Sequence, residues 1–294
     1  MALIDVLNDA VSGLEGTLGV SVKHLETGET ASINGGDLFP MASVFKVPVI
    51  IEFFRQLESR TVSLDEKKML AEADKVPGSG ILKELSNGLE LTYGDLLRLM
   101  MILSDNTATD LVIKRVGKDR VNATIRSLGL EETKVVADCR DILFDLIGLG
   151  DLPDEEKTLA LFTEKAQGTT LVGTWSLGVE ENDVTTSSEM LRLLEMIVEG
   201  KAASRESCNE IMEIMSKCQT GGNRIPKYLP RAEMKLTHKT GSLPGIRNDA
   251  GLVTIQATGE RYILSCFIKG AADVYAAEET IAMVSKSVYK YFTK

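Results

Sequence analysis

Arg261-Tyr262-Ile263-Leu264-Ser265-Cys266-Phe267-Ile268 is the stretch that decides the fold class of this 294-residue chain. Its aromatic and β-branched side chains are typical of a β-strand. The preceding runs 233–239 and 250–255 have the same character, so the C-terminal part of the chain is predicted to form three strands. Alternation of polar and apolar residues over 19–24 and 30–34, with a turn between them, predicts a β-hairpin near the N-terminus.

The chain between these two ends has the apolar spacing of α-helices. Helices are predicted over 47–59, 92–103, 107–116 and 187–199 and, at the C-terminus, over 276–291. Strands at both ends with helices between them indicate an α+β fold, in which both chain ends build one antiparallel sheet with flanking helices. We expect this α/β lobe to comprise residues 1–40 and 219–294, and an all-helical lobe to comprise residues 41–218.

The composition argues against several classes of partner. The formal net charge is −10 and no stretch is rich in both basic and aromatic residues, so nucleic acid is not expected as a partner. No apolar run is long enough to span a bilayer, so no membrane span is expected. Residues 1–5 lack the basic start and apolar stretch of a secretory signal. We therefore expect a cytoplasmic protein, or a secreted or periplasmic one if a leader has been removed.

The cysteines and histidines do not have the spacing of a metal site. The four cysteines are Cys139, Cys208, Cys218 and Cys266, and the two histidines are His24 and His238. There is no CxxC pair and no histidine at zinc-ligand spacing, so free thiols in a reducing compartment and no bound metal are expected. A Ser-His-Asp triad would have to use one of the two histidines, and His238 lies on a predicted strand where packing is the simpler role.

Three short motifs carry the candidate chemistry. In chain order they are Ser43-Val44-Phe45-Lys46, Ser104-Asp105-Asn106 and Lys239-Thr240-Gly241. A Ser-x-x-Lys tetrad alone is common by chance. All three motifs in this order, with the last near the C-terminus, are hard to attribute to chance.

Ser43 is the candidate nucleophile and Lys46 its candidate base. A serine hydroxyl needs a nearby base near neutral pH, and residues three apart share one face of a helix. Lys46 serves as a base only when neutral, which requires burial or a nearby positive charge such as that of Lys239. Residues 40–42 place the serine at a helix start, where its free N–H can point at a carbonyl oxygen. The alternative is an ordinary N-cap serine beside a solvated lysine.

Residues 104–106 lie in a predicted turn between two helices. We expect Ser104 to pass a proton to the leaving group. Asn106 would clamp either the substrate or Lys46. Helix capping explains the same residue types without any catalysis.

The residues from Lys239 to Ser242 follow a strand pattern and are the candidate substrate-binding edge. Gly241 would let the backbone lie close to a ligand, and the N–H of Ser242 would be a second oxyanion donor beside that of the nucleophile. Lys239 and Thr240 would attract a substrate carboxylate. Arg247 would add a bidentate contact to it, or is a surface arginine in a turn. The expected partner is a small-molecule acyl substrate that carries a carboxylate.

The three motifs together resemble those of class A β-lactamases and penicillin-binding proteins. The likeness extends through their flanks, 39–48, 104–108 and 238–242, and residues 182–186 resemble the end of the family's Ω-loop. This resemblance implies an α/β lobe and an all-α lobe with Ser43 at their junction. It also implies a two-step reaction through an acyl-enzyme, without metal or organic cofactor.

The chain departs from that family where the family activates water. Class A β-lactamases have a Glu-x-x-Leu-Asn Ω-loop whose Glu activates the deacylating water, and no such pentapeptide occurs here. Arg140-Asp141-x-x-Phe144-Asp145 imitates the pattern loosely, with Asp141 as the carboxylate. The alternatives are that none is catalytic or that a rival serves: Asp138, Asp145, Glu164 or Glu180. The segment 141–183 around it is predicted to be a loop between the lobes with one or two short helices.

Three functions fit these residues. The first is a serine hydrolase of the class A β-lactamase type that opens a β-lactam or a related amide through Ser43. The second is a relative that acts on another acyl substrate, such as a D-alanyl peptide, a small amide or an ester. The third is a penicillin-binding sensor that becomes acylated and deacylates slowly.

Overall fold

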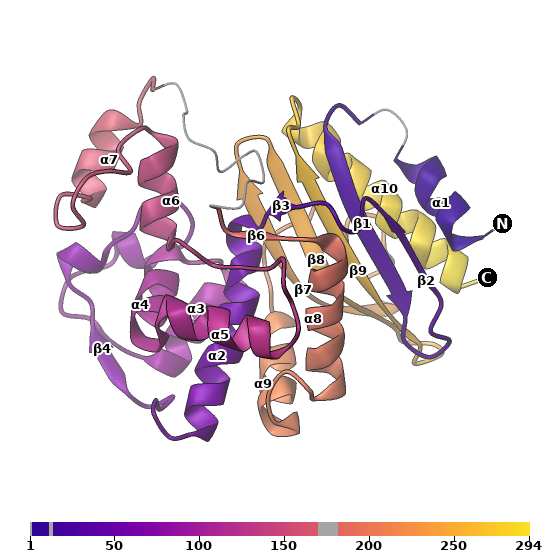
Figure 1. The fold of residues 1–294 in the computed structure, drawn as a ribbon, viewed down its shortest axis with the longest axis horizontal. Coiled ribbons are helices and arrows are strands. Elements are labelled where there is room, and N and C mark those ends of the chain that lie inside the picture. Colours follow the sequence, from indigo (N-terminus) through magenta and orange to yellow (C-terminus); the bar gives the residue numbers. More distant parts are fainter. Residues whose placement is uncertain (1, 12–13, 170–181) are drawn as a thin grey trace.

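The structure is a computed structural model that describes residues 2–11, 14–169 and 182–294. A five-stranded sheet in the order β2-β1-β9-β8-β7 forms one end of the molecule (Figure 1). Its strands are β1 (Thr17–His24), β2 (Thr30–Ile33), β7 (Met234–Leu243), β8 (Ile246–Ile255) and β9 (Arg261–Lys269). All neighbouring strands are antiparallel, and β1 pairs with β9 along its full length, so the two chain ends share one sheet. The predicted α+β class is confirmed.

Helices cover both faces of this sheet. α1 (Leu3–Ala10) and α10 (Val274–Phe292) lie on one face, and α8 (Ser187–Glu199) packs on the other (Figure 1). The neighbouring side chains Phe267 and Ile268 of β9 enter different hydrophobic cores, because successive side chains of a strand point to opposite faces. Burial on both faces explains why β9 is a continuous apolar run.

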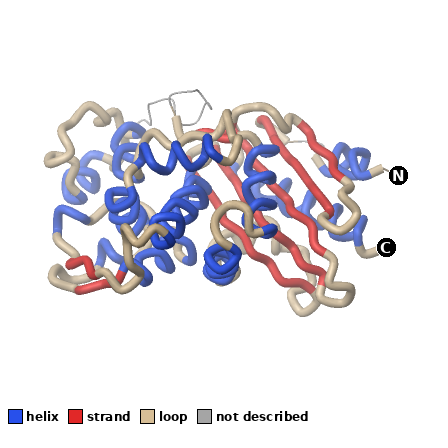
Figure 2. The backbone as a smooth tube through the Cα atoms, turned by 60° about the horizontal axis from the view of Figure 1, so that its bottom comes forward, coloured by secondary structure: helices blue, strands red, loops and turns tan. Residues whose placement is uncertain are grey.

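The second lobe is mainly helical (Figure 2). It contains α2 (Lys46–Glu58), α3 (Tyr93–Ile102), α4 (Asn106–Val116), α5 (Lys118–Ser127) and α9 (Arg205–Met215). α2 lies at its centre, and Ile50 and Phe53 of α2 are fully buried. The ends of these helices are fixed by residues visible in the sequence. Thr92 Oγ1 accepts a hydrogen bond from Asp95 N at 3.1 Å at the start of α3, and Gly117, with φ of 87°, ends α4.

The segment 41–218 differs in two respects from an all-helical lobe. It contains the short strands β4 (Lys67–Met69) and β5 (Glu90–Thr92), which pair with each other, and β6 (Val184–Thr185), which pairs with β3 (Phe39–Pro40). It also supplies α8 to the sheet. The apolar face of α8 packs there because a sheet face must be covered by another element to form a core.

The segment 141–183, predicted to be a loop with one or two short helices, contains most of one helix and all of another. α6 (Cys139–Leu146) packs on α4, and α7 (Leu159–Lys165) lies beside α6 at the end of the molecule farthest from the sheet (Figure 1). The rings of Phe144 and Phe162 join them at a centroid distance of 5.5 Å. Within the described ranges, no helix is both long and apolar enough to cross a membrane.

Candidate active site

Ser43 lies in the 3₁₀-helix η1 (Ala42–Phe45), between β3 and α2, where the two lobes meet. Groups distant in sequence hold the backbone just before it. Met41 N donates to Asp183 O at 2.8 Å, and the buried Asn248 amide donates to Pro40 O at 2.8 Å and Met41 O at 2.9 Å. The position of the candidate nucleophile is therefore fixed by contacts from outside its own helix.

Strand β7 passes very close to η1 because residue 241 is glycine. A methyl group at Gly241 would lie 2.5 Å from Met41 O and 3.1 Å from the backbone nitrogen of Ser43. Only glycine permits an approach of this kind. Among the described strands, β7 lies at the edge of the sheet and pairs with β8 alone. Its main chain at Gly241 and Ser242 is thus presented beside Ser43.

Lys46 is fully buried directly after η1. Its Nζ donates to Ser104 O at 2.7 Å, to Ser104 Oγ at 3.1 Å and to Asn106 Oδ1 at 3.0 Å. Burial lowers the pKa of Lys46 because the charged form is poorly solvated there. A neutral Lys46 is expected to require either burial or a nearby positive charge, and burial is the condition that lowers its pKa.

Ser104 receives a second lysine from the opposite lobe. Lys239 is fully buried on β7, and its Nζ donates to Ser104 Oγ at 3.0 Å and to Thr240 O at 2.7 Å. Burial, followed by the positive charge of Lys46, lowers the pKa of Lys239 to about 7. Ser104 has a φ of 58°, an uncommon backbone conformation for a residue other than glycine. Two amines of lowered pKa thus share one hydroxyl group, which provides a route for protons.

The other two residues of this turn have structural contacts. Asp105 caps α4 by accepting from Ala108 N at 2.9 Å, and it also accepts from Ile81 N at 2.7 Å. The Asn106 amide nitrogen donates to Pro77 O at 2.9 Å while its oxygen holds Lys46. The sequence predicts that Asn106 holds either the substrate or Lys46, and in the structure its side-chain oxygen accepts a hydrogen bond from Lys46. This turn therefore both caps α4 through Asp105 and holds Lys46 through Asn106.

Arg224 is a buried cation beneath β7 that the sequence analysis did not single out. Its Nη1 donates to Gly241 O at 3.0 Å and to Asn248 O at 2.7 Å, and its Nη2 donates to Ser242 Oγ at 2.6 Å. Glu278 pairs with Nη2 at 2.9 Å. The only sequence signal is an arginine after two glycines shortly before a strand, which is too common to identify a site.

Comparison with known proteins agrees with this geometry. The β-lactamase enzyme family model matches residues 2–292. The chain belongs to the β-lactamase enzyme family. This confirms the predicted class, a serine β-lactamase-type hydrolase.

Relatives and solved structures cover nearly the whole chain. β-Lactamase VEB-1 of Pseudomonas aeruginosa is 22% identical over 285 residues, which are 94% of this chain and 85% of that protein. The crystal structure of a β-lactamase from Sphaerobacter thermophilus DSM 20745 is 30% identical, with a TM-score of 0.80, and covers 98% of this chain and 96% of its own. The structure of PBP-A is 24% identical, with a TM-score of 0.79 over 99% of this chain and 96% of its own, and supports the fold alone.

Arg247 of this β-lactamase-family protein is held at the β7–β8 turn. Its Nη1 donates to Leu243 O at 3.0 Å and to Ile246 O at 2.7 Å, and its Nε lies 3.2 Å from Glu278 Oε1. These contacts fit the alternative prediction, in which Arg247 is an arginine of the turn rather than a contact for the substrate carboxylate. Arg247 is the β8 partner of Ser242 in the sheet, and the side chain that donates to the Ser242 hydroxyl is that of Arg224.

Asp141 does not face Ser43. Its carboxylate pairs with Lys157 at 2.8 Å and with Lys118 at 3.4 Å. Burial opposes ionisation of Asp141, but the Lys157 hydrogen bond and the charges of both lysines outweigh burial and lower its pKa. The face of α6 towards Ser43 carries Cys139, Ile142, Leu143 and Leu146. The geometry therefore does not support the predicted role of Asp141 in activating water.

The rival carboxylates have other positions. Asp138 caps α6, with Asp141 N donating to it at 3.0 Å, and Glu164 pairs with Lys165 at 2.8 Å. Asp145 lies beside Gly150, and Glu180 is outside the described residues. Within the described part of the chain, no carboxylate lines the cavity at Ser43.

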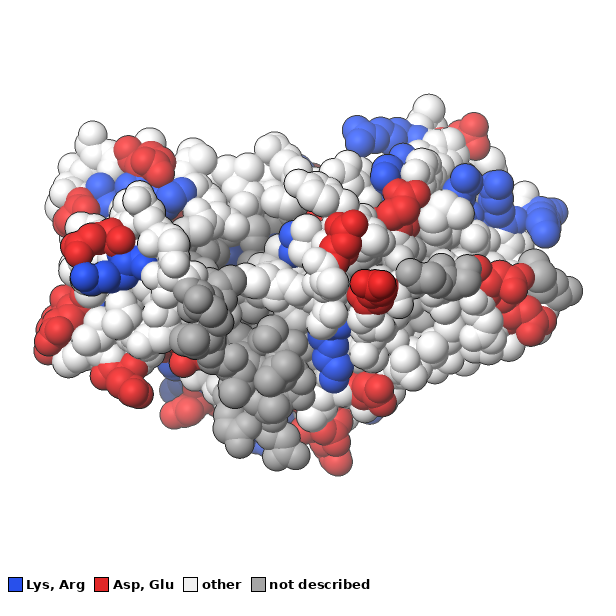
Figure 3. Space-filling view, turned by 90° about the horizontal axis from the view of Figure 1, so that it is seen from above, with Lys and Arg blue, Asp and Glu red and all other residues white. Residues whose placement is uncertain are grey.

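That cavity measures about 250 Å³ and lies between the lobes. Its polar end carries Ser43, Asn106 and Ser242, while α6 and α7 supply apolar side chains opposite them. Uncharged surface borders much of the hollow between the lobes, and acidic and basic side chains are spread over both lobes (Figure 3). The cavity can therefore take an acyl group beside the candidate nucleophile.

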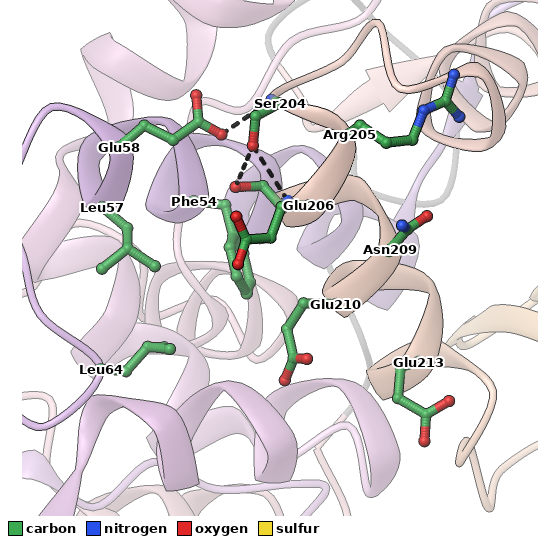
Figure 4. Close-up of a pocket in the computed structure, with 11 residues that line it drawn as sticks. Phe54, Leu57, Glu58, Leu64, Ser204, Arg205, Glu206, Asn209, Glu210 and Glu213 are labelled. Atoms are coloured by element: carbon green, nitrogen blue, oxygen red, sulfur yellow. Dashed lines mark hydrogen bonds between the residues drawn. The ribbon is translucent and has the colours of Figure 1, made fainter.

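A larger cavity of about 990 Å³ lies between α2 and α9 (Figure 4). Its residues include Glu58, Glu206 and Glu210, and Ser204 there caps α9 and donates through its backbone to Glu58 Oε1 at 2.9 Å. It lacks a serine–lysine pair, so its lining does not suggest acyl transfer. Across the ranges that the structure covers, no cluster of three or more His, Cys, Asp or Glu residues could hold a metal ion.

Proposed function

We propose that this protein hydrolyses a β-lactam or a related amide through an acyl-enzyme on Ser43. The main support is that Lys46 Nζ and Lys239 Nζ converge on Ser104 Oγ, at 3.1 Å and 3.0 Å, from opposite lobes. Lys46 follows directly after the turn that holds Ser43. VEB-1 and the other relatives compared with this chain carry the name β-lactamase, and this chain matches the β-lactamase enzyme family model.

In the acylation step, Ser43 Oγ attacks the carbonyl carbon while the neutral Lys46 amine accepts the hydroxyl proton. The new C–O bond forms and the C–N bond of the amide breaks. Ser104 passes a proton from Lys46 to the leaving nitrogen, and Lys239 can resupply it. The backbone N–H groups of Ser43 and Ser242 would stabilise the oxyanion. The close contact of β7 with η1 at Gly241 supports this pairing of donors.

The substrate carboxylate would bind along β7. Lys239 and Thr240 would contact it, and Ser242 would donate to it because Arg224 holds the Ser242 hydroxyl at 2.6 Å. Thr220 fixes Thr240 in turn, with 2.5 Å between their hydroxyl oxygens. Arg224 has this role as a positioning residue, since its Nη2 also pairs with Glu278.

A second function is favoured by one specific observation. Within the described residues, the cavity at Ser43 has no carboxylate to activate a deacylating water. Hydrolysis of the ester would then be slow, and the protein would act as a penicillin-binding acceptor or sensor. The two functions share the first step and differ in the rate of the second.

Intact-protein mass spectrometry during incubation with benzylpenicillin tests both functions. We expect one added penicillin per chain, absent in Ser43→Ala, followed by its loss as the ester is hydrolysed. An adduct that persists for hours would support the acceptor function. Labelling that survives in Ser43→Ala would overturn the proposal for this serine.

We propose the cytoplasm as the location. All four cysteines are free thiols, and Cys139, Cys208 and Cys266 are buried. Free thiols are typical of a reducing compartment. Fractionation of the native host, with detection of the protein by antibody, is the test, and recovery outside the cytoplasmic membrane would contradict it.

A further inference from the structure

A cluster of nucleophilic and titratable side chains lies beside β7, outside the lining of the cavity at Ser43. It consists of Cys218, Thr220, His238 and Asp249, and we call it the thiol cluster. Cys218 and Thr220 belong to the connection after α9, while His238 lies on β7 and Asp249 on β8. Cys218, His238 and Asp249 have no part in the reaction proposed above, so their arrangement calls for a separate explanation.

His238 and Asp249 form a buried ion pair next to Cys218. His238 Nδ1 lies 2.7 Å from Asp249 Oδ1, and Asp249 Oδ2 accepts from Ile225 N at 3.2 Å. Gly251 is opposite His238 on β8, and a methyl group there would lie 2.4 Å from His238 Cβ, so the pairing requires glycine. Burial opposes the charged imidazole, but the charge and hydrogen bond of Asp249 outweigh burial and raise the pKa of His238 to about 10. His238 is therefore a cation near neutral pH.

This cation faces the thiol of Cys218. Burial opposes ionisation of Cys218, but the hydrogen bond and charge of His238, with the charge of Lys239, outweigh burial and lower the pKa of the thiol to about 7. Cys218 Sγ also lies 3.2 Å from Thr220 Oγ1. A sulfur beside an imidazole that a carboxylate holds in place is the arrangement of an activated cysteine nucleophile.

The other cysteines of the chain have a different environment. Of the four, Cys218 alone is not fully enclosed, and it follows α9 between the exposed residues Lys217 and Gln219. Burial raises the pKa of the remaining three thiols, which are Cys139, Cys208 and Cys266. A reagent in solution should therefore react at Cys218 first.

Two hydroxyl groups connect Cys218 to the candidate substrate-binding strand. Thr220 Oγ1, which contacts Cys218 Sγ, lies 2.5 Å from Thr240 Oγ1. The thiolate charge also favours the ammonium form of Lys239, against the burial and the Lys46 charge that lower the pKa of Lys239. A group attached to Cys218 Sγ would remove this negative charge and displace Thr220 from its contact with Thr240.

We propose that Cys218 is a modification site at which its thiolate exchanges with a low-molecular-weight disulfide of the glutathione class, and that this modification slows acylation of Ser43. In the exchange, Cys218 Sγ attacks one sulfur of the disulfide. A new S–S bond forms to that sulfur, the original S–S bond breaks, and the other half leaves as a thiolate. A second thiol molecule reverses the exchange. The effect on acylation rests on the proposed function, whereas the exchange itself does not.

The first experiment follows the reaction of the full chain with glutathione disulfide by intact mass and peptide mapping. We expect one glutathione per chain, attached to Cys218 and absent in Cys218→Ser, at a rate that rises with pH through about 7. His238→Gln should lower the rate at pH 7 about fivefold, because the loss of thiolate exceeds the gain in its nucleophilicity. His24→Gln, at the histidine that lies near Glu26, is the matched control and should keep the rate within about twofold. Attachment to another cysteine, or a wild-type midpoint near the ordinary thiol pKa of 9.0, would overturn the site.

The second experiment measures acylation by benzylpenicillin before the exchange, after it, and after reduction with dithiothreitol. We expect the modified chain to react at least about tenfold more slowly, because the contact of Thr240 with the substrate carboxylate is lost, and to recover on reduction. Cys218→Ser keeps a hydroxyl beside Thr220, so it should retain most of its rate and should not respond to glutathione disulfide.

The possible results separate this inference from the proposed function. If Cys218 is fully modified and acylation slows by less than twofold, the control of acylation is overturned and the proposed function stands. If benzylpenicillin does not acylate the reduced wild type, the proposed function fails and the control of acylation fails with it. The peptide map still decides whether Cys218 is the modification site in that case.

Discussion

The surroundings of Ser43 combine two regions that are built very differently. On the side of η1, Ser104 and β7, buried polar groups are connected by hydrogen bonds from Lys46, Lys239, Asn248 and Arg224. On the side of α6 and α7, apolar side chains face the same cavity and the charged groups point elsewhere.

We infer that the polar region serves the reaction itself and that the apolar region serves the choice of substrate. Buried polar networks hold reacting groups in one geometry because any unpaired member is costly. An apolar surface accepts groups of many shapes, since apolar contact is not directional. We therefore expect changes in the first region to alter reaction rates and changes in the second to alter substrate preference. The following predictions test that division.

The largest expected effect is that of removing the candidate base. Lys46→Ala should slow acylation about 10²- to 10⁴-fold, because proton acceptance from Ser43 is lost. Lys157→Ala is the matched control, as Lys157 is also a buried lysine but pairs with Asp141 in the second region. It should change the rate by less than about twofold. Stopped-flow or mass measurements of acylation check both, and an unchanged rate in Lys46→Ala would assign the base to another group.

A smaller effect on acylation is expected from removing Asn248, which holds the backbone just before Ser43. Asn248→Ala removes the donor to Pro40 O and Met41 O, so the free energy of unfolding should fall by about 1–3 kcal/mol. Acylation should slow as well, because the position of Ser43 is no longer fixed.

A matched amide away from Ser43 is Asn122 of α5, whose Nδ2 donates to Val135 O at 2.6 Å. Asn122→Ala should lower stability without slowing acylation. Urea unfolding and acylation rates measured on both variants test this contrast, and equal slowing in the two would contradict it.

The charge of Lys239 gives a pH dependence. Its pKa is lowered from 10.5 to about 7, so the ammonium group is lost as pH rises through about 7. The ratio of acylation rates for a penicillin and its methyl ester should therefore fall about tenfold as pH rises through this range, since only the acid gains from the cation. Lys239→Arg keeps its charge and should flatten the ratio. A ratio in the wild type that does not change with pH would remove Lys239 from carboxylate binding.

The same shift affects stability with a definite sign. Between about pH 7 and 10.5 the unfolded chain binds more protons at Lys239 than the folded chain does. The contribution of Lys239 to stability therefore rises with pH across that window and is lost as the pH falls through it.

The smallest expected effect is that of Asp141. Because its carboxylate pairs with Lys157 and Lys118 rather than facing Ser43, Asp141→Asn should leave deacylation within about twofold of the wild-type rate. The decay of the penicillin adduct, followed by mass, is the measurement. An adduct that persists only in the variant would restore Asp141 as the group that activates water.

Much of the arrangement could be predicted because it depends on local pattern. The apolar run in 261–268 is read directly as a strand, and the three motifs mark the candidate site residues from Ser43 to Ser242. Arg224 and Asn248 could not be found in this way. Their importance comes from contacts with residues far along the chain, such as Ser242 and Pro40, and those pairs leave no pattern in a single sequence.

The sequence by itself determined the fold class, the family and the identity of the serine and lysine motifs, because these depend on residue type and short spacing. Only the tertiary structure decided which way side chains face. It paired Asp141 with Lys157, brought Lys46 and Lys239 to Ser104, and placed Leu143 and Phe162 in the lining of one cavity. The physical reason is that the direction of a side chain depends on the packing of whole helices and strands, and those contacts join residues that are distant in sequence.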